Sequence, residues 1–204
     1  MNPSAIIVLG ASMGGVDALQ RIAADLRPEI PAALFVVQHV GRNASQLPHI
    51  LRRAGRMPAV HAKEGQAFAA GSIYVAPPDH HLTLGAGRVH LSRGPRENWA
   101  RPAIDPLFRS AAKAYGPRVV GVILTGLLND GSAGLRAVRA AGGLAVVQDP
   151  ADAMATDMPW NALRHAGADY RVRLAEIPAL LTQLSNELVL KSETTHLTEV
   201  EGES

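Results

Sequence analysis

An apolar run followed by a glycine-rich turn stands near the start of the chain and constrains its fold more than any other stretch. Residues 6–9 are mostly β-branched and predict a buried strand, and a helical pattern begins at Gly15. Ser12 therefore lies on a tight strand-to-helix turn between Gly10 and Gly14, where glycine lets neighbouring backbone approach closely. The pattern Gly10-x-Ser12-x-Gly14 fits a nucleophile elbow, which holds a serine hydroxyl at the mouth of an α/β sheet.

A phosphate-binding turn is the alternative interpretation, and the turn by itself gives the two equal weight. Amides at a helix start bind a phosphate as readily as a developing oxyanion. The Gly-x-Gly-x-x-Gly fingerprint is missing, because Ser12 stands where the second glycine is needed. The Gly-Lys-Ser/Thr of a P-loop is missing as well. The rest of the sequence is needed to choose between a nucleophile elbow and a phosphate-binding turn.

Composition excludes several classes of protein. The 204 residues are enough for one domain with a substantial core, and the absence of Cys excludes disulfides and thiolate chemistry. No apolar run approaches ~20 residues, and no basic segment precedes the first apolar stretch. We therefore expect no transmembrane helix, no signal peptide and no direct membrane insertion, and we expect a cytoplasmic location.

The charge pattern argues against a nucleic-acid partner. The formal net charge is +2, the arginines are scattered, and two Trp, three Tyr and three Phe offer little for stacking on bases. Acidic residues gather in the last 13 positions, which hold no Lys or Arg, so the body is more basic than the total suggests. Such a body suits an acidic protein partner.

Strand and helix patterns alternate along the chain. This predicts an α/β fold with a doubly wound, mostly parallel sheet flanked by helices, and an added antiparallel β-hairpin. The folded domain is expected over residues 1–191, with an acidic, disordered tail over 192–204. The predicted strands cover residues 5–9, 33–38, 58–62, 72–76, 81–84, 88–91, 119–124, 144–148 and 170–172, and the predicted helices cover 15–26, 43–54, 104–115, 133–141, 159–166 and 176–190.

Three polar residues each follow the carboxyl end of a predicted buried strand: Ser12, His39 and Asp130. A parallel sheet brings such ends to one edge. A serine nucleophile needs a base to take its proton, and an imidazole needs an acid to fix its tautomer. Two simpler interpretations stay open: His39 as a strand-end histidine bonded to a loop, and Asp130-Gly131 as a turn. No spacing of His, Asp or Glu indicates a metal site, and no cofactor is expected.

Several segments, in register, resemble the catalytic domain of the CheB-type protein-glutamate methylesterases of bacterial chemotaxis. The resemblance covers roughly residues 5–185. The matching segments are Gly10-Ala11-Ser12-Met13-Gly14-Gly15, Val37-Gln38-His39, Tyr74-Val75-Ala76-Pro77-x-Asp79-x-His81, Arg101-Pro102-x-Ile104-Asp105-x-Leu107-Phe108, Gly121-Val122-Ile123-Leu124-Thr125-Gly126, Asn129-Asp130-Gly131 and Met158-Pro159.

The resemblance implies a function. Ser12, His39 and Asp130 would be nucleophile, base and orienting acid in demethylating glutamate γ-methyl esters on chemoreceptor cytoplasmic helices, and in deamidating receptor glutamines. It also implies oxyanion or substrate contacts, for which the candidates are Met13, Leu127, His81 and Arg101. Two other functions stay open: an inactive interaction module of the same fold in a chemosensory pathway, and a small-molecule esterase.

The chain also departs from the family pattern. Met13 replaces a small or hydroxyl residue, Leu127-Leu128 replaces Met-Gly, and Asp157 replaces a glycine. If the family glycine has a positive φ, Leu128 must strain or reshape the loop that carries Asp130. The receiver domain that normally comes first is missing before the first strand. We therefore expect a stand-alone, constitutively active domain, controlled by its expression or by a separate regulatory protein.

Overall fold

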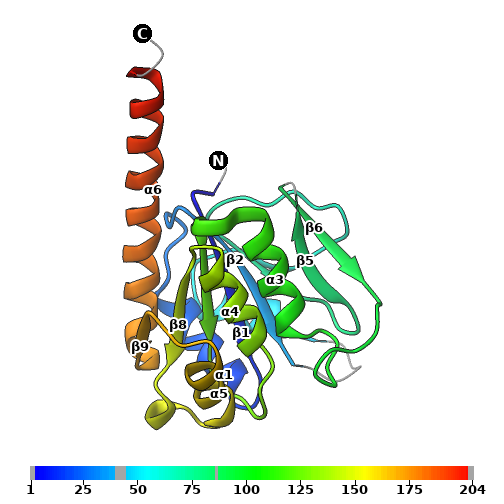
Figure 1. The fold of residues 1–204 in the computed structure, drawn as a ribbon. Helices are drawn as coiled ribbons and strands as arrows, with labels where there is room; N and C mark the ends of the chain where they lie inside the picture. Colours follow the sequence, from blue (N-terminus) through cyan, green and yellow to red (C-terminus); the bar gives the residue numbers. More distant parts are fainter. Residues whose placement is uncertain (1–2, 40–44, 86, 202–204) are drawn as a thin grey trace.

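The computed structural model describes residues 3–39, 45–85 and 87–201. Within them, seven parallel strands form one sheet in the order β3-β4-β2-β1-β7-β8-β9, and two antiparallel strands form the hairpin β5-β6 (Figure 1). The strands are β1 Ala5–Ala11, β2 Ala32–Gln38, β3 Ala59–His61, β4 Ser72–Val75, β5 His81–Gly85, β6 Arg88–Ser92, β7 Val119–Ile123, β8 Leu144–Gln148 and β9 Tyr170–Val172. The helices are α1 Gly15–Asp25, α2 Leu47–Ala54, α3 Ile104–Tyr115, α4 Ser132–Ala140, α5 Asp157–His165 and α6 Ile177–Glu201.

The order in which strands are added to the sheet reverses at β1. The chain builds outward from β1 through β2 to β4 and β3, then returns to place β7, β8 and β9 on the other side of β1. In a doubly wound sheet this switch point leaves a crevice at the carboxyl ends of the two strands. The turn after β1 and the loop after β7 therefore meet at one edge of the molecule.

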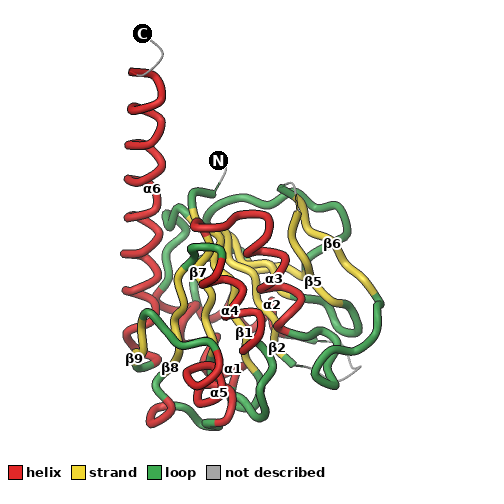
Figure 2. The backbone as a smooth tube through the Cα atoms, viewed as in Figure 1, coloured by secondary structure: helices red, strands yellow, loops and turns green. Residues whose placement is uncertain are grey.

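Two hydrophobic cores cover the two faces of the sheet. Side chains alternate along a strand, so Ile7 and Leu9 of β1 pack on one core while Ile6 and Val8 pack on the other. Helices α1, α2 and α6 supply the first core; α3, α4, α5 and the hairpin supply the second, and Figure 2 shows the helices flanking the strands. All seven residues of β1 are buried, as expected of a central strand covered on both faces.

The predicted fold class is confirmed, and every predicted strand and helix is present. The helix predicted over 43–54 begins at Leu47 with Pro48 in its first turn, and the predicted residues 43 and 44 lie outside the described part of the chain. Proline is well placed there because its missing N–H has no helical partner in that turn. The glycine-rich turn of the hairpin includes Ala86, which is also outside the described residues.

The closing helix is longer than predicted. The predicted end at Leu190 is wrong, because α6 continues to Glu201 and the predicted tail over 192–204 is helical up to that residue. No Gly or Pro occurs between Leu190 and Gly202, so the sequence holds no stop signal there. The division of the chain at residue 191 stays a prediction. Among the described residues, no helix has the length and apolarity needed to cross a bilayer.

Candidate active site

Ser12 follows the last residue of β1 and begins the turn into α1. Its amide donates to the Thr125 carbonyl at 3.0 Å, which ties the serine to the chain leaving β7. Gly14 has φ 76°, a left-handed conformation that glycine adopts without steric cost. The turn leaves the Ser12 side chain partly exposed at the carboxyl edge of the sheet, as a nucleophile elbow does.

His39 joins this serine to Asp130. Its Nδ1 lies 3.1 Å from Ser12 Oγ, and its Nε2 lies 2.7 Å from Asp130 Oδ2. A carboxylate only accepts hydrogen bonds, so Nε2 carries the proton and Nδ1 is free to accept the serine hydroxyl proton. The three strand-end residues thus form one connected hydrogen-bonded row, with the imidazole side chain 21% exposed.

Asp130 is almost fully buried, at 2% exposure, and each carboxylate oxygen accepts two hydrogen bonds. Oδ2 accepts from His39 Nε2 and from the Ile104 amide at 2.7 Å; Oδ1 accepts from Asn98 Nδ2 at 2.7 Å and from the Asp105 amide at 3.2 Å. Burial by itself raises the pKa of Asp130, but the bonds from His39, Ile104 and Asn98 outweigh it, so the pKa lies below its ordinary value. Asp130 is therefore held as a charged carboxylate, and it accepts hydrogen bonds from the first two amides of α3.

The sequence did not single out Gln38 and Thr125 as site residues. Their side chains hydrogen-bond to the backbone at and near Ser12 and His39. The side-chain amide of Gln38 donates through Nε2 to the Ser12 carbonyl at 2.8 Å and to the His39 carbonyl at 3.1 Å. Thr125 Oγ1 contacts the Met13 carbonyl at 2.9 Å and accepts the Ala155 amide at 2.8 Å. Gln38 is the last residue of β2 and Thr125 follows the end of β7 by two residues, so a polar side chain at or just after a strand end was the signal available in the sequence.

Gly126 lies directly against the serine. A methyl group on Gly126 would stand 2.8 Å from Ser12 Cβ and would overlap the sulfur of Met158, which is fully buried. Real Cβ atoms do not approach other carbons so closely, so either the serine or the methionine would have to move. The backbone at Gly126 thus limits where the Ser12 side chain can lie.

Gly126→Ala is expected to lower the free energy of unfolding by about 1–3 kcal/mol through overpacking. It is also expected to slow any ester hydrolysis that uses Ser12 up to about 100-fold, because a displacement near 1 Å misplaces the Ser12 hydroxyl. Urea unfolding and turnover measure the two effects. Gly94→Ala is the matched control, since a methyl there meets only Ser92 Oγ at 3.7 Å. Equal behaviour of the two variants would contradict the close contact at Gly126.

The backbone amides beside Ser12 are the candidates for binding an oxyanion. Within the described residues, neither the Met13 amide nor the Leu127 amide donates a hydrogen bond. Both residues lie at the carboxyl edge, with side chains 52% and 43% exposed. The prediction that they contact substrate or oxyanion stays a prediction.

His81 and Arg101 lie in the hairpin and in the loop before α3, and both hold that loop. His81 is 4% exposed, with Nε2 2.9 Å from the Pro95 carbonyl and Nδ1 3.3 Å from the Ala103 amide. Arg101 pairs with Asp79 at 2.6 Å and donates to two loop carbonyls. Their observed contacts are therefore structural, and the substrate contacts suggested for them stay a prediction.

Leu128 has φ 65°, so the residue that replaces the family glycine occupies a left-handed conformation. The Leu128 amide lies 3.4 Å from Asp157 Oδ2, and the Leu128 carbonyl accepts from Asn161 at 2.7 Å. A non-glycine residue in this conformation costs about 1–2 kcal/mol. The loop carrying Asp130 is thus strained at Leu128 and held by two side chains of α5.

Leu128→Gly is expected to raise the free energy of unfolding by about 0.5–1 kcal/mol, because the removed strain exceeds the entropy that glycine adds to the unfolded chain. The Leu128 side chain is 63% exposed, so little packing is lost. Urea unfolding measures the gain. Leu127→Gly, which relieves no left-handed residue, is the matched control and is not expected to gain. A Leu128→Gly protein no more stable than the parent would contradict strain at this position.

Side chains suited to a metal do not cluster: among the described residues there is no group of three or more His, Asp or Glu able to hold an ion.

The fold and this hydrogen-bonded row define the class: an α/β protein with a Ser-His-Asp triad at the switch point of a parallel sheet. The model of the CheB methylesterase family matches residues 7–181, and the chain belongs to that family. In the structure of the Thermotoga maritima CheB methylesterase catalytic domain, the matched region is 32% identical, with a TM-score of 0.85 over 88% of this chain and 98% of that one.

Curated relatives agree with this assignment. A Leptospira interrogans protein, named for protein-glutamate methylesterase and protein-glutamine glutaminase, is 37% identical over 90% of this chain and 96% of its own length. Proteins of the same name from Anaeromyxobacter dehalogenans and Myxococcus xanthus are 38% and 37% identical over 88% and 89% of this chain. The chain spans about half the length of these last two relatives.

Proposed function

We propose that the protein hydrolyses glutamate γ-methyl esters on the cytoplasmic helices of chemoreceptors, and that it also deamidates receptor glutamines. The observation that carries the proposal is the Ser12–His39–Asp130 row, with 3.1 Å and 2.7 Å between its hydrogen-bonded atoms. The names of the relatives supply the substrate class.

In the first half of the reaction, Ser12 Oγ attacks the ester carbonyl carbon while His39 Nδ1 takes the hydroxyl proton. The C=O double bond becomes a C–O⁻ bond, and the amides of Met13 and Leu127 are our proposed donors to that oxygen. Asp130 accepts a hydrogen bond from the Nε2–H group of His39 throughout, which orients the ring and stabilises its positive charge. The tetrahedral intermediate collapses, the C–OCH₃ bond breaks, and His39 returns its proton to the departing methoxide, so methanol leaves.

In the second half, water attacks the acyl-enzyme. His39 Nδ1 takes a proton from the water, and the new C–O bond forms as before. When the intermediate collapses, Ser12 Oγ leaves and takes the proton back from the imidazole. The products are a receptor glutamate and the free enzyme. With a glutamine substrate the same steps release ammonia in place of methanol.

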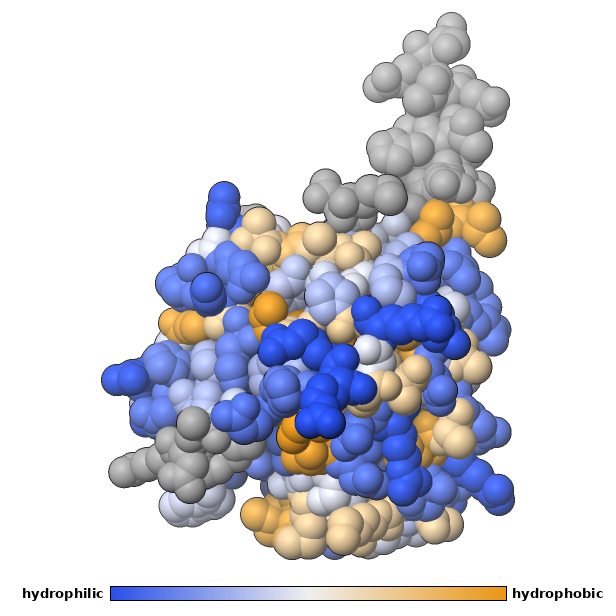
Figure 3. All heavy atoms as spheres, turned by 180° about the vertical axis from the view of Figure 1, so that it is seen from behind, coloured by the Kyte–Doolittle hydropathy of each residue, from blue (hydrophilic) through white to orange (hydrophobic). Residues whose placement is uncertain are grey.

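The surface around the site suits a helical protein substrate. Exposed apolar side chains lie in the turn after β1, in the loops after β7 and β8, and on α5: Met13, Leu127, Leu128, Met154 and Trp160. Figure 3 shows mixed polar and apolar residues over the face seen from behind, with apolar ones along the lower edge. An amphipathic helix carrying the methyl ester would bury this rim as it presents its ester to Ser12.

The test is methanol release from receptor membranes methylated with a labelled methyl group. The proposal requires release of labelled methanol together with the appearance of free glutamate at the methylated positions. Turnover of small esters without any turnover of methylated receptors would overturn the assignment of substrate.

A further inference from the structure

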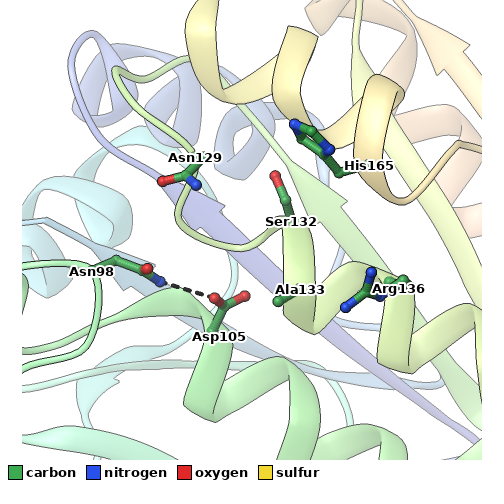
Figure 4. A pocket seen from close by; sticks show the side chains of 7 residues that line it. All are labelled: Asn98, Asp105, Asn129, Ser132, Ala133, Arg136 and His165. Atoms are coloured by element: carbon green, nitrogen blue, oxygen red, sulfur yellow. Dashed lines mark hydrogen bonds between the residues drawn. The ribbon is translucent and has the colours of Figure 1, made fainter.

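Asn98 lies between two buried carboxylates. Its Nδ2 donates to Asp130 Oδ1 at 2.7 Å and to Asp105 Oδ2 at 2.8 Å. Asp130 is 2% exposed and Asp105 is 5% exposed. Figure 4 shows Asn98 on its loop and Asp105 at the start of α3, joined across one wall of a pocket of about 260 Å³.

The contacts fix which way this amide faces. Both neighbours are carboxylate oxygens, which only accept, so the NH₂ group has to point at them and the carbonyl oxygen away. Asp105 is held in turn, because its Oδ1 accepts the Gly134 amide of α4 at 2.6 Å. Burial, with the nearby charge of Asp130, raises the pKa of Asp105, so the donors on both of its oxygens matter to its charge.

The backbone at Asn98 is also special. Glu97 and Ala100 exchange hydrogen bonds at 3.2 and 2.9 Å, and the residues between them have φ 49° at Asn98 and φ 63° at Trp99. Two consecutive left-handed residues make a type I′ turn, which asparagine accepts and a bulky side chain resists. The Trp99 side chain is 89% exposed, so burial of its ring does not offset this cost. Such a turn aims Asn98 inward at the two carboxylates.

We propose that Asn98 is a positioning residue for the triad: it holds Asp130 in the orientation that faces His39, and Asp105 holds Asn98. The row of contacts then runs from α4 through Asp105, Asn98 and Asp130 to His39 and Ser12. This inference rests on the proposed function only in that both use the same triad.

Asn98→Gly tests the proposal, because glycine suits the left-handed turn and removes only the side chain. Loss of a hydrogen bond to a charged group is expected to lower kcat about 10- to 100-fold with KM little changed. The acid limb of the kcat–pH profile is expected to move to higher pH, because the hydrogen bond from Asn98 lowers the pKa of Asp130 and its loss leaves that carboxylate more basic. The other charged or titratable groups facing Asp130 or its pocket are Asp105, Arg136 and His165.

A second variant reaches the same contact from the other side. In Asp105→Asn the new amide keeps the bond from Gly134 with its oxygen and turns its NH₂ toward Asn98. This NH₂ group would face the NH₂ group of Asn98, and two donors cannot bond to each other. The Asn98 amide therefore has to rotate, which turns its carbonyl oxygen toward Asp130 and removes the hydrogen bond to that carboxylate. We expect kcat to fall as in Asn98→Gly, and the double variant to lose no more than the worse single variant.

The controls separate this role from stability and from substrate identity. Asn129→Ala removes an exposed amide from the same pocket and is expected to keep kcat within twofold. A fluorophosphonate probe, which reacts with activated serines, reports the triad without any receptor, so it gives the answer even if the natural substrate is not a methylated receptor. Slower labelling of Ser12 in folded Asn98→Gly supports the proposal. Unchanged kcat, labelling rate and pH profile, or losses that multiply in the double variant, would overturn it.

Discussion

Ser12→Ala is expected to abolish hydrolysis of glutamate methyl esters while leaving the protein folded. In a serine protease, removing the nucleophile of a triad costs on the order of 10⁶ in turnover, and the same loss is expected here. Ser12 is partly exposed, and within the described residues its hydroxyl bonds only to His39, whereas the backbone of Ser12 makes the contacts that hold the turn. The free energy of unfolding should therefore change little.

Release of labelled methanol, measured beside a thermal melt, checks this expectation. Ser132→Ala is the matched control, because the buried Ser132 hydroxyl makes no hydrogen bond within the described residues and lies outside the triad. That variant should keep the parent rate. Near-normal turnover in folded Ser12→Ala would remove Ser12 from the mechanism.

Asp130→Asn is expected to lower kcat about 10⁴-fold, less than the near-complete loss expected for His39→Gln. The reason is the set of four donors around the carboxylate: His39, Asn98 and the amides of Ile104 and Asp105. An asparagine has to turn its NH₂ toward two of these donors, whichever way it faces. The imidazole then loses its fixed tautomer, or the start of α3 loses its acceptor.

The same substitution has a pH signature. The pKa of Asp130 is lowered in the folded protein, so its charge stabilises the fold above the pKa of the unfolded carboxyl, ~3.9. That contribution disappears as pH falls through the lower folded pKa. The parent should therefore be more stable than Asp130→Asn at pH 7, and the difference should shrink below about pH 4. Urea unfolding at both pH values measures it, and a difference that stays constant would contradict a charged Asp130.

The sequence predicted the triad geometry because each member occupies a position defined locally. A strand end can be recognised from its own apolar run, and a parallel sheet then brings Ser12, His39 and Asp130 to one edge without further information. The sheet class followed from the same alternation of strands and helices. The end of α6 was missed because residues 191–201 are polar, a property that exposed helices and disordered tails share.

Asn98 could not have been found in this way. Its place depends on a turn in which tryptophan occupies a left-handed conformation, against the preference of that residue, so local preferences predict a different path for the loop. Asp105 falls within a family motif, but its partner on α4 is 29 residues away in the sequence. Contacts of this kind arise from the packing of two helix starts.

The three members of the triad follow β2, β1 and β7, which are neighbours at the centre of the sheet. Central strands are usually the last part of a domain to open during native-state fluctuations, as amide exchange shows in many proteins. Ser12, His39 and Asp130 therefore follow the strands whose amides are expected to exchange most slowly, whereas the described non-glycine residues with a positive φ lie in loops. Opening of an edge strand alone would leave Ser12, His39 and Asp130 in place. Activity should therefore be lost only when the whole domain unfolds cooperatively.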